Sequence, residues 1–485
     1  MVSQELEDAF HPRSIAVVGA SGNPASMGYR YVYHLIHNGY RGKIYPVTPH
    51  WSEILGFKAY PFLRDIPNTI DYVICCLPAS KVIDLLMECS AKGVKVVHLY
   101  TARFSETGRE DSVEMETELL QRARRCGVRL IGPNCMGLYY PREGIAFSYD
   151  FTTEPGTVGM FFQSGGACVE FIHQAFLRGI RFSKVISYGN ALDLNEADFL
   201  EYFSHDRETE IIASYIEGVK DGRRFLHTMS QVAPLKPVII LKAGRGGAGA
   251  RAVASHTGAL AGSLKVWETA IRQTGAIQAL TIEEMLDIVT SFYFLPPILG
   301  TRVGIVGGGG GKSVLSADEW EEAGFNVVPL SPEIEDEIRK RLPELWWGWL
   351  RNPVDISILP EDALINNFGG EVLRMMAKSP SFDLLIANIS VSAPFANDEL
   401  AAYLSKEVDD IIDIVRNEPK PLAVILDTGA LNIQDFDHLR WRCLAELKSR
   451  LVAAKIPVYS SPSEAANAII RLVNYYRRRK NIRSY

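Results

Sequence analysis

The chain has 485 residues, of which 47% are hydrophobic and 22% charged, and its formal net charge is −6. This composition is typical of globular proteins, excludes a fibrous or largely disordered chain, and leads us to expect about three domains. The negative net charge disfavours a nucleic-acid partner, because the chain as a whole offers no positive field to attract phosphates.

The N-terminal sequence and the cysteines indicate the cellular compartment in which the protein is expected. The first residues carry acidic side chains, where a signal peptide would have a basic start and an apolar core. The best membrane candidate, residues 288–300, is short and broken by Pro296 and Pro297, so we interpret it as a linker between domains. The cysteines form no CxxC pair, which indicates reduced thiols and disfavours a zinc site. We expect a cytoplasmic protein without membrane association or a bound metal.

Strand-like apolar runs alternate with amphipathic, helix-length stretches along nearly the whole chain. This alternation is typical of parallel sheets covered by helices. Three times a strand runs into glycines and then into a helix, beginning at Ser14, Thr157 and Thr301. The sequence therefore predicts an α/β protein with three doubly wound parallel-sheet domains, at residues 1–145, 146–295 and 296–485. Further strands are expected at residues 43–47, 71–77, 94–100, 130–132, 185–187, 210–216, 237–242, 276–280, 325–330, 383–389, 421–427 and 457–459.

The first glycine loop, GASGNPASMG, begins at Gly19. Backbone N–H groups and a helix N-terminus can face an anion in such a loop, although a tight turn alone would also need glycine. The glycines are not spaced as GxGxxG, and Thr48, Pro49 and His50 stand where a dinucleotide fold places an acidic residue for the ribose. Nicotinamide binding is therefore disfavoured, and a phosphate-bearing nucleotide fits better.

The second glycine loop, QSGGAC, begins at Gln163 and precedes a helix-length stretch. Glu217 ends a strand of the same domain. Open α/β sheets bind their ligands at the carboxyl ends of their strands, so both features point to one site. The alternative is that Glu217 simply meets solvent, as most carboxylates do.

The segment SHTGALAG, residues 255–262, surrounds His256 with small, uncharged side chains. It follows the glycine- and alanine-rich stretch that begins at Gly244, which predicts a mobile loop, and a helix is expected from Ser263. Small neighbours let an imidazole move, and a carboxylate such as Glu217 could fix its tautomer. These features fit a nucleophilic histidine, but the residues alone leave open a capping or core histidine ahead of that helix, which is the more common role of a single histidine.

The third glycine loop, VGGGGGKS, ends like a Walker A motif. Val306, however, occupies the position of the first glycine of that motif, so nucleotide hydrolysis is disfavoured here. Trp346, Trp347 and Trp349 follow later in this domain and could shape an acyl pocket or serve only in packing.

Taken together, the motifs resemble the α subunit of the nucleoside-diphosphate-forming acyl-CoA synthetases, the ADP-forming acetyl-CoA synthetase group, with succinyl-CoA synthetase as a more distant relative. The resemblance covers about residues 12–475, and the combination of SHTGALAG with the upstream LKAGR is specific. It implies a Rossmann-like CoA-binding domain followed by two flavodoxin-like domains, the first of which carries the phosphohistidine loop. The matching motifs are SIAVVGASGNPASMG, IYPVTP, IGPNCMG, FFQSGG, SYGNALD, SYIEG, PVIILKAGR, SHTGALAG and NPVDIS.

The resemblance implies a phosphoryl relay. An acyl-CoA thioester and phosphate would give an acyl phosphate, which would phosphorylate His256, and the phosphoryl group would then pass to ADP in an ATP-grasp domain. Glu217 would orient His256. The phosphoryl group would be held by Ser164, Gly165 and Gly166. CoA would be bound by Gly19, Ser21, Asn23, Pro49, His50 and Pro78.

The chain also departs from the family pattern. His50 stands where relatives usually have lysine, and the third loop is richer in glycine than usual. No ATP-grasp sequence follows Tyr485, so a separate ATP-grasp β subunit is expected to bind ATP or ADP with Mg²⁺ in an α2β2 heterotetramer. A small carboxylic acid and its acyl-CoA are the expected substrates. Two alternatives remain: a CoA or acyl-CoA regulatory protein without ligase activity, and a nicotinamide-dependent oxidoreductase.

Overall fold

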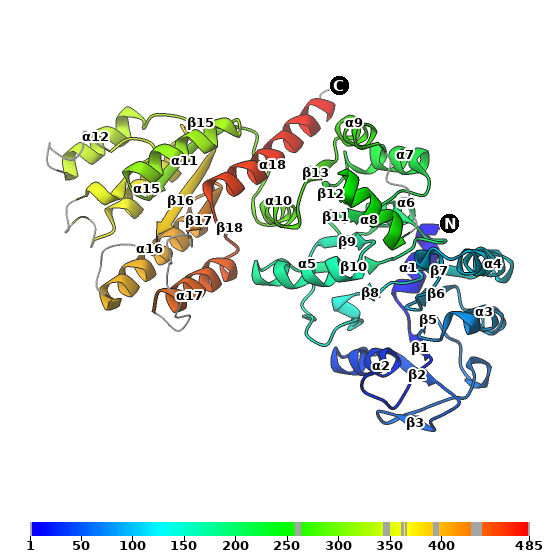
Figure 1. The fold of residues 1–485 in the computed structure, drawn as a ribbon. Coiled ribbons are helices and arrows are strands. Elements are labelled where there is room, and N and C mark those ends of the chain that lie inside the picture. The colour runs from blue at the N-terminus through cyan, green and yellow to red at the C-terminus, as the bar shows by residue number, and fades with distance from the viewer. Residues whose placement is uncertain are drawn as a thin grey trace. The chain divides into compact units, whose positions relative to one another are not determined.

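A computed structural model describes residues 2–257, 263–342, 350–359, 363, 366–390, 397–427 and 439–483. The chain divides into two compact units, Met1–Met285 and Leu286–Tyr485. The described residues form three large sheets, two in the first unit and one in the second, with helices packed on them (Figure 1). The predicted α/β class with doubly wound parallel sheets is confirmed. Within the described residues no helix is both long enough and apolar enough to span a membrane.

The first sheet has the strand order β2-β1-β5-β6-β7, and its paired strands are parallel. Its central strands are buried along their whole length, which is typical of a sheet covered by helices on both faces. A short hairpin of β3 and β4 follows the edge strand β2. The elements are α1 (Val2–Phe10), β1 (Ser14–Val18), α2 (Met27–His37), β2 (Lys43–Val47), β3 (Glu53–Ile54), β4 (Phe57–Lys58), η1 (Leu63–Asp65), β5 (Tyr72–Cys75), η2 (Ala79–Lys81), α3 (Val82–Ala91), β6 (Val96–Leu99), η3 (Ser105–Thr107), α4 (Glu110–Cys126) and β7 (Arg129–Ile131).

The middle sheet has the order β13-β12-β11-β9-β10-β8. The edge strand β8 runs antiparallel to β10 and was not predicted, because three residues beginning with a glycine give no periodic signal. The elements are β8 (Gly137–Tyr139), η4 (Pro141–Glu143), β9 (Val158–Phe162), α5 (Gly165–Leu177), β10 (Phe182–Ser187), α6 (Glu196–His205), β11 (Ile211–Ile216), α7 (Gly222–Val232), β12 (Val238–Lys242), α8 (Gly247–Thr257), α9 (Leu264–Thr274) and β13 (Ile277–Ala279).

The glycine- and alanine-rich stretch that begins at Gly244 was expected to be a loop, but Gly247–Thr257 forms the helix α8, since alternating alanines favour helix enough to offset its glycines. Residues 258–262 of the predicted mobile loop lie outside the described residues. The stretch interpreted as a linker begins inside α10 (Ile282–Phe294), whose apolar side chains Met285, Leu286 and Val289 are fully buried. The helix ends before Pro296, which cannot donate the backbone hydrogen bond that a further turn would need.

The third sheet has the order β15-β14-β16-β17-β18, and its paired strands are parallel. Its core is one cluster of buried aliphatic side chains between the sheet and its helices. The elements are β14 (Arg302–Gly307), α11 (Gly310–Glu322), β15 (Asn326–Val327), α12 (Pro332–Arg341), η5 (Ile356–Ile358), α15 (Phe368–Lys378), β16 (Leu384–Ser390), α16 (Asn397–Asn417), β17 (Leu422–Asp427), α17 (Leu439–Ala453), β18 (Val458–Tyr459) and α18 (Pro462–Arg483).

The strand order reverses once in each large sheet, between β1 and β5, between β9 and β11, and between β14 and β16. At such a point the helices that follow the two strands leave on opposite faces, so a crevice opens at the carboxyl ends of the strands. Glycine is required at this crevice in the first and the third sheet. A Cβ on Gly19 (φ +85°) would lie 2.9 Å from a backbone atom of Cys76, and one on Gly307 (φ +101°) would lie 2.2 Å from the carbonyl oxygen of Asn388.

Candidate active site at the carboxyl edge of the middle sheet

The crevice between β9 and β11 holds two buried polar side chains, Gln163 and Glu217, each 3% exposed. Gln163 follows β9, and its Oε1 accepts hydrogen bonds from the backbone N–H groups of Glu217 and Gly218, the latter at 3.1 Å. The alternative that Glu217 only meets solvent is therefore wrong. Sequence reasoning missed Gln163, although a polar residue at the junction of an apolar strand and a glycine loop was the available signal.

The Glu217 carboxylate has a second neighbour in Tyr215. Burial raises the pKa of Tyr215 to about 12, and the charge of Glu217 and a hydrogen bond between the two side chains contribute to the same shift. The ammonium group of Lys242 donates to the backbone carbonyl of Glu217 at 2.7 Å and to that of Ala243. Burial lowers the pKa of Lys242, and the Glu217 charge opposes that shift. A negative and a positive charge are thus held side by side at the strand ends.

The N-terminus of α5 enters the same crevice directly after Gln163. Ser164 is the N-cap residue, and its Oγ accepts a hydrogen bond from the backbone N–H of Ala167 at 3.3 Å. Gly166 is exposed, and a Cβ added there would meet no atom within 4 Å, whereas one on Gly165 would lie 3.0 Å from Met136. An anion can therefore approach the backbone at this helix end, where the macrodipole places about half a positive charge.

His256 lies in the last turn of α8, the helix that follows β12. Its side chain and residues 258–262 lie outside the described residues, so its predicted contact with Glu217 stays a prediction. The helix α8 contacts η3, which follows β6 of the first sheet. The helix that carries His256 therefore follows a strand of the middle sheet and contacts an element that follows a strand of the first sheet.

The first sheet brings part of the predicted CoA site together. Gly19 directly follows β1 and Pro78 follows β5, so both flank the crevice where the strand order reverses. Ser21 and Asn23 shape the loop before α2: the Ser21 hydroxyl accepts from the backbone N–H of Asn23 at 3.1 Å, and the Asn23 Oδ1 accepts from that of Ala25 at 3.0 Å.

Pro49 and His50 follow the neighbouring strand β2 and are exposed. The next residue, Trp51, is 49% exposed, and its ring lies against the glycine loop, because a Cβ on Gly22 would come within 2.7 Å of it. Sequence reasoning missed Trp51, since only the tertiary fold brings the end of β2 beside this loop. An aromatic surface thus borders the loop.

In the third sheet the glycine-rich loop leads into α11, as predicted. Lys312, the lysine of the GKS sequence, forms an ion pair with Asp427 at the end of β17. A cavity of about 200 Å³ lies beside this pair. The predicted roles of Trp346, Trp347 and Trp349 fall on residues outside the described ones. Among the residues that the structure describes, no cluster of His, Cys, Asp or Glu is placed to hold a metal ion.

Two family models match the chain: a CoA binding domain over residues 13–141 and a succinyl-CoA ligase like flavodoxin domain over residues 155–292. Over 473 residues the chain is 37% identical to the α subunit of acetate–CoA ligase (ADP-forming) II of Pyrococcus furiosus, which covers 96% of this chain and 97% of that protein. It is 30% identical to acetate–CoA ligase (ADP-forming) II of Archaeoglobus fulgidus, over 98% of this chain and 68% of that protein.

A solved structure is also similar over nearly the whole chain. It is the dinucleotide-forming acetyl-coenzyme A synthetase 1 of Ca. Korarchaeum cryptofilum in complex with phosphate and ADP, with a TM-score of 0.83, 32% identity, and coverage of 99% of this chain and 98% of that one. The resemblance drawn from the motifs and the expected acid–thiol ligase class are confirmed. The chain belongs to the family of the ADP-forming acetate–CoA ligases.

Proposed function

We propose that the chain is the CoA-binding, phosphoryl-carrying subunit of an ADP-forming acyl-CoA synthetase. In the direction of ATP formation, a phosphate oxygen attacks the thioester carbonyl, the C–S bond breaks, and CoA leaves as the thiol. A ring nitrogen of His256 then attacks the phosphorus of the acyl phosphate, the P–O bond breaks, and the carboxylic acid leaves. Transfer from phosphohistidine to ADP gives ATP and regenerates the imidazole.

One observation supports this function above the others: the buried carboxylate of Glu217 and the open helix end at Gly166 share one crevice. A carboxylate beside an imidazole fixes its tautomer and stabilises the positive charge that develops during transfer. The helix N-terminus stabilises the negative charge of the moving phosphoryl group. The small residues before His256 add no bulk that would block the group's approach.

CoA is proposed to lie in the crevice of the first sheet. The match to a CoA binding domain over residues 13–141 supports this placement. Gly19, Ser21 and Asn23 lead into α2, so the N-terminus of that helix would face the CoA diphosphate. Pro49, His50 and Pro78 would border the nucleotide, and His50 would stand in place of a lysine beside a phosphate.

The second half-reaction needs a nucleotide site. The Pyrococcus relative is named as a subunit, which supports a partner chain. That partner is proposed to be an ATP-grasp β subunit that binds ATP or ADP with Mg²⁺, in a cytoplasmic α2β2 heterotetramer. Light scattering on the complex purified with this chain should give the mass of that assembly, and a chain that binds no ATP-grasp polypeptide would contradict the proposal.

Phosphoryl labelling tests the relay. The full chain, with its ATP-grasp partner, is incubated with ATP radiolabelled at the γ-phosphate and Mg²⁺. We expect acid-labile, base-stable label on this chain and its loss in His256→Ala. His227→Ala, which removes an exposed histidine of α7, is the matched control and should keep the label. Label that persists in His256→Ala would contradict the proposal.

A further inference from the structure

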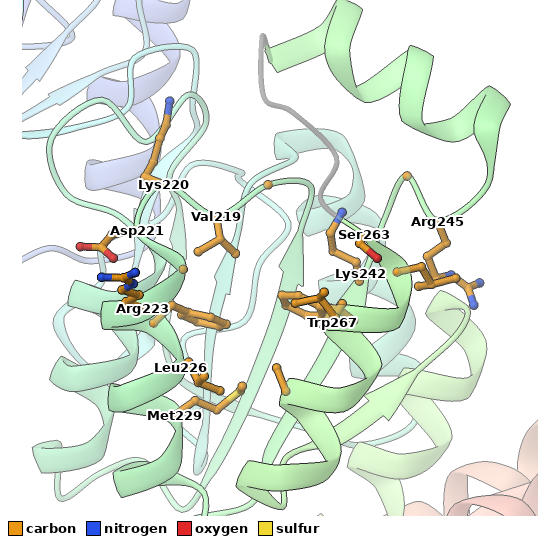
Figure 2. A pocket seen from close by; sticks show the side chains of 17 residues that line it. Val219, Lys220, Asp221, Arg223, Leu226, Met229, Lys242, Arg245, Ser263 and Trp267 are labelled. Carbon is orange, nitrogen blue, oxygen red and sulfur yellow. The ribbon is translucent and has the colours of Figure 1, made fainter.

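A cavity of about 630 Å³ opens between α7 and α9, beside the carboxyl ends of β11 and β12 (Figure 2). Its volume falls in the range of about 300 to 1,000 Å³ that is typical of small-molecule sites. Helix α7 contributes three apolar side chains to its wall and helix α9 contributes four. These are Phe225, Leu226, Met229, Leu264, Val266, Trp267 and Ala270.

The aromatic part of this wall is ordered by stacking. The rings of Phe225 and Trp267 lie 6.1 Å apart between centroids, with an angle of 13° between their planes. Leu226 is 36% exposed and Val266 is 69% exposed, so apolar surface continues to the mouth of the cavity. Exposed aliphatic side chains that line a cavity favour an apolar occupant.

The charges around this wall are mostly positive. The cations are Lys220, Arg223, Lys242 and Arg245, and Asp221 is the one carboxylate among the lining residues that the structure describes. Asp221 is already engaged, since its Oδ1 accepts a hydrogen bond from the backbone N–H of Arg224 at 3.0 Å and so caps α7. The electrostatic field at the cavity therefore favours an anion.

The mouth offers donors for such an anion. Lys242 and Ser263 lie beside each other at the top of the cavity, and Arg245 stands at its rim, where it donates to the carbonyl of Leu280 at 2.6 Å (Figure 2). Ser263 is the N-cap residue of α9 and lines the cavity, and its side chain forms no capping bond to the first N–H groups of that helix. An anionic head group at the mouth and an apolar body below it would satisfy both halves of the cavity.

The cavity adjoins the candidate active site. Gly218, which directly follows Glu217, belongs to its lining, and Lys242 donates to the Glu217 carbonyl at 2.7 Å. Ser263 lies seven residues after His256 along the chain. A carboxyl group at the mouth would therefore be near the residues proposed to carry the phosphoryl group.

We infer that this cavity binds the hydrocarbon body of a carboxylic acid substrate larger than acetate, with its carboxylate at the mouth beside Lys242. The inference rests on the proposed function and adds to it the place and the class of the acid. A two-carbon acid would leave most of the apolar wall without contacts. Longer or ring-bearing acids would cover Phe225, Leu226 and Trp267.

Direct binding of acids to the full chain tests this inference without any turnover. Saturation-transfer NMR measures the affinity for acetate, propionate, butyrate and 3-phenylpropionate. Affinity should rise about 4-fold for each added methylene, the factor that corresponds to about 0.8 kcal/mol per buried CH₂. Equal affinity along the series would overturn the inference.

Two variants locate the binding. Ala270→Phe fills the cavity from α9 and should weaken 3-phenylpropionate about 10-fold while acetate is unchanged. Leu226→Ala removes wall surface and should weaken butyrate and 3-phenylpropionate only. Leu235→Ala is the matched control, because Leu235 is 60% exposed and lies outside the cavity lining. Affinities that do not change in the first two variants would overturn the inference.

Two further outcomes distinguish an acid-binding cavity from a protein-docking surface, and the cavity assignment from the phosphoryl relay. If Ala270→Phe and Leu226→Ala weaken binding of the ATP-grasp polypeptide but leave the acid series unchanged, the cavity is a protein-docking surface and the inference is overturned. If the acid series follows the expected pattern while His256→Ala keeps its phosphoryl label, the relay fails and the cavity assignment stands.

Discussion

Two buried lysines lie at opposite edges of the middle sheet and are held in different ways. Lys184 lies near the amino end of β10 and is 0% exposed, and its ammonium group is 3.0 Å from Asp206 and 3.0 Å from Glu208. Lys242 ends β12 and is 6% exposed, and its ammonium group donates to the backbone carbonyls of Glu217 and Ala243. One charge is neutralised by carboxylates, and the other is held by carbonyl dipoles.

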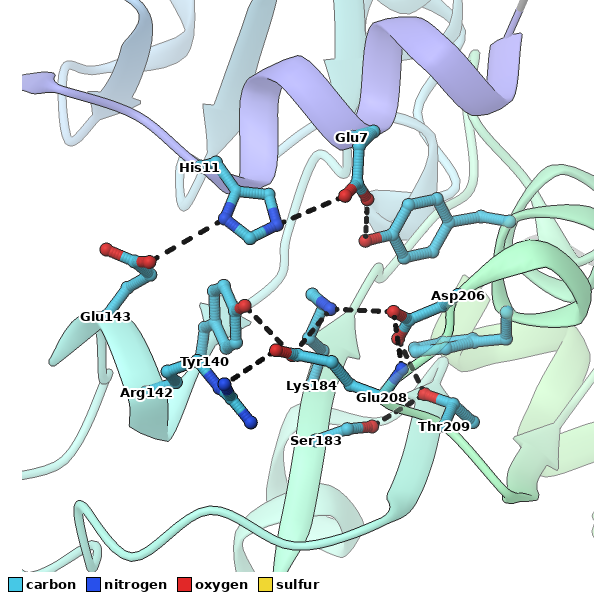
Figure 3. A network of polar contacts seen from close by, with 12 residues as sticks. Glu7, His11, Tyr140, Arg142, Glu143, Ser183, Lys184, Asp206, Glu208 and Thr209 are labelled. Atoms are coloured by element: carbon cyan, nitrogen blue, oxygen red, sulfur yellow. Dashed lines mark hydrogen bonds and ion pairs between the residues drawn. The ribbon is translucent and has the colours of Figure 1, made fainter.

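The amino edge extends this pairing into a network (Figure 3). Tyr140 donates to Glu208 at 2.9 Å, Arg142 pairs with Glu208 at 2.8 Å, and Tyr202 donates to Glu7 of α1 at 2.8 Å. The charged groups at this edge pair with one another and are therefore unavailable to a ligand. Their hydrogen bonds and ion pairs connect α1, η4 and the sheet. The carboxyl edge holds the Lys242 cation beside the buried carboxylate of Glu217, and the helix end at Gly166 lies open in the same crevice. Variants at the amino edge should therefore change the stability of the fold, and variants at the carboxyl edge should change ligand binding and phosphoryl transfer.

The largest expected effect is on stability at the amino edge. Lys184→Met leaves the buried Asp206 without its cation and leaves Glu208 with Arg142 alone, which should cost about 3 to 5 kcal/mol of unfolding free energy. Urea denaturation measures the loss, and phosphoryl labelling per folded molecule should not change. Arg109→Ala is the control: it breaks an exposed ion pair with Asp111 and should cost less than about 1 kcal/mol.

The carboxyl edge should show the opposite pattern. Glu217→Gln keeps the shape of the side chain but removes the negative charge that is proposed to support the imidazole of His256. Phosphoryl transfer should slow at least about 100-fold, or about 2.7 kcal/mol, with little change in urea denaturation. Rapid-quench labelling measures the rate. A variant that is unstable but transfers phosphoryl groups normally when folded would place Glu217 among the structural residues.

A smaller effect is expected at the helix end. Ser164→Ala and Asn195→Ala each remove an N-cap side chain, on α5 and α6, and each should cost about 1 kcal/mol of stability. Only Ser164→Ala should also raise the KM for phosphate, because α5 alone of the two begins in the crevice between β9 and β11. Equal KM values in the two variants would remove Ser164 from the phosphate site.

The smallest stability change is expected for the second lysine. Lys242→Met loses two hydrogen bonds to carbonyls but also removes the cost of burying a charge, so unfolding free energy should change by less than about 1 kcal/mol. Binding of carboxylic acids should nevertheless weaken. A loss as large as that of Lys184→Met would show that both lysines serve the fold, and the contrast between the edges would fail.

Local patterns were enough to predict most strands and that a helix follows the second and the third glycine loop. Apolar runs bounded by glycine predict strands well, and Glu217 was found because it ends such a run. The crevices follow from strand order, which a repeated strand–glycine–helix pattern already indicates.

Features that depend on tertiary contacts were not predictable in this way. The strand β8 exists because β10 offers it an edge, and Trp51 reaches the first loop because β2 lies beside β1. Gln163 contributes to the site because its side chain accepts hydrogen bonds from the backbone N–H groups of Glu217 and Gly218, which follow another strand. The helix α8 was misjudged because glycine content was weighed above its alternating alanines.

The site of the phosphoryl group tests the central claim most directly. The full chain is phosphorylated from acyl-CoA and inorganic phosphate, digested at neutral pH or above to preserve the P–N bond, and fragmented in a mass spectrometer. We expect the phosphoryl group on the ring of His256. A phosphoryl group on any other residue, with His256 unmodified during turnover, would contradict the assignment of the chemistry to the carboxyl edge of the middle sheet.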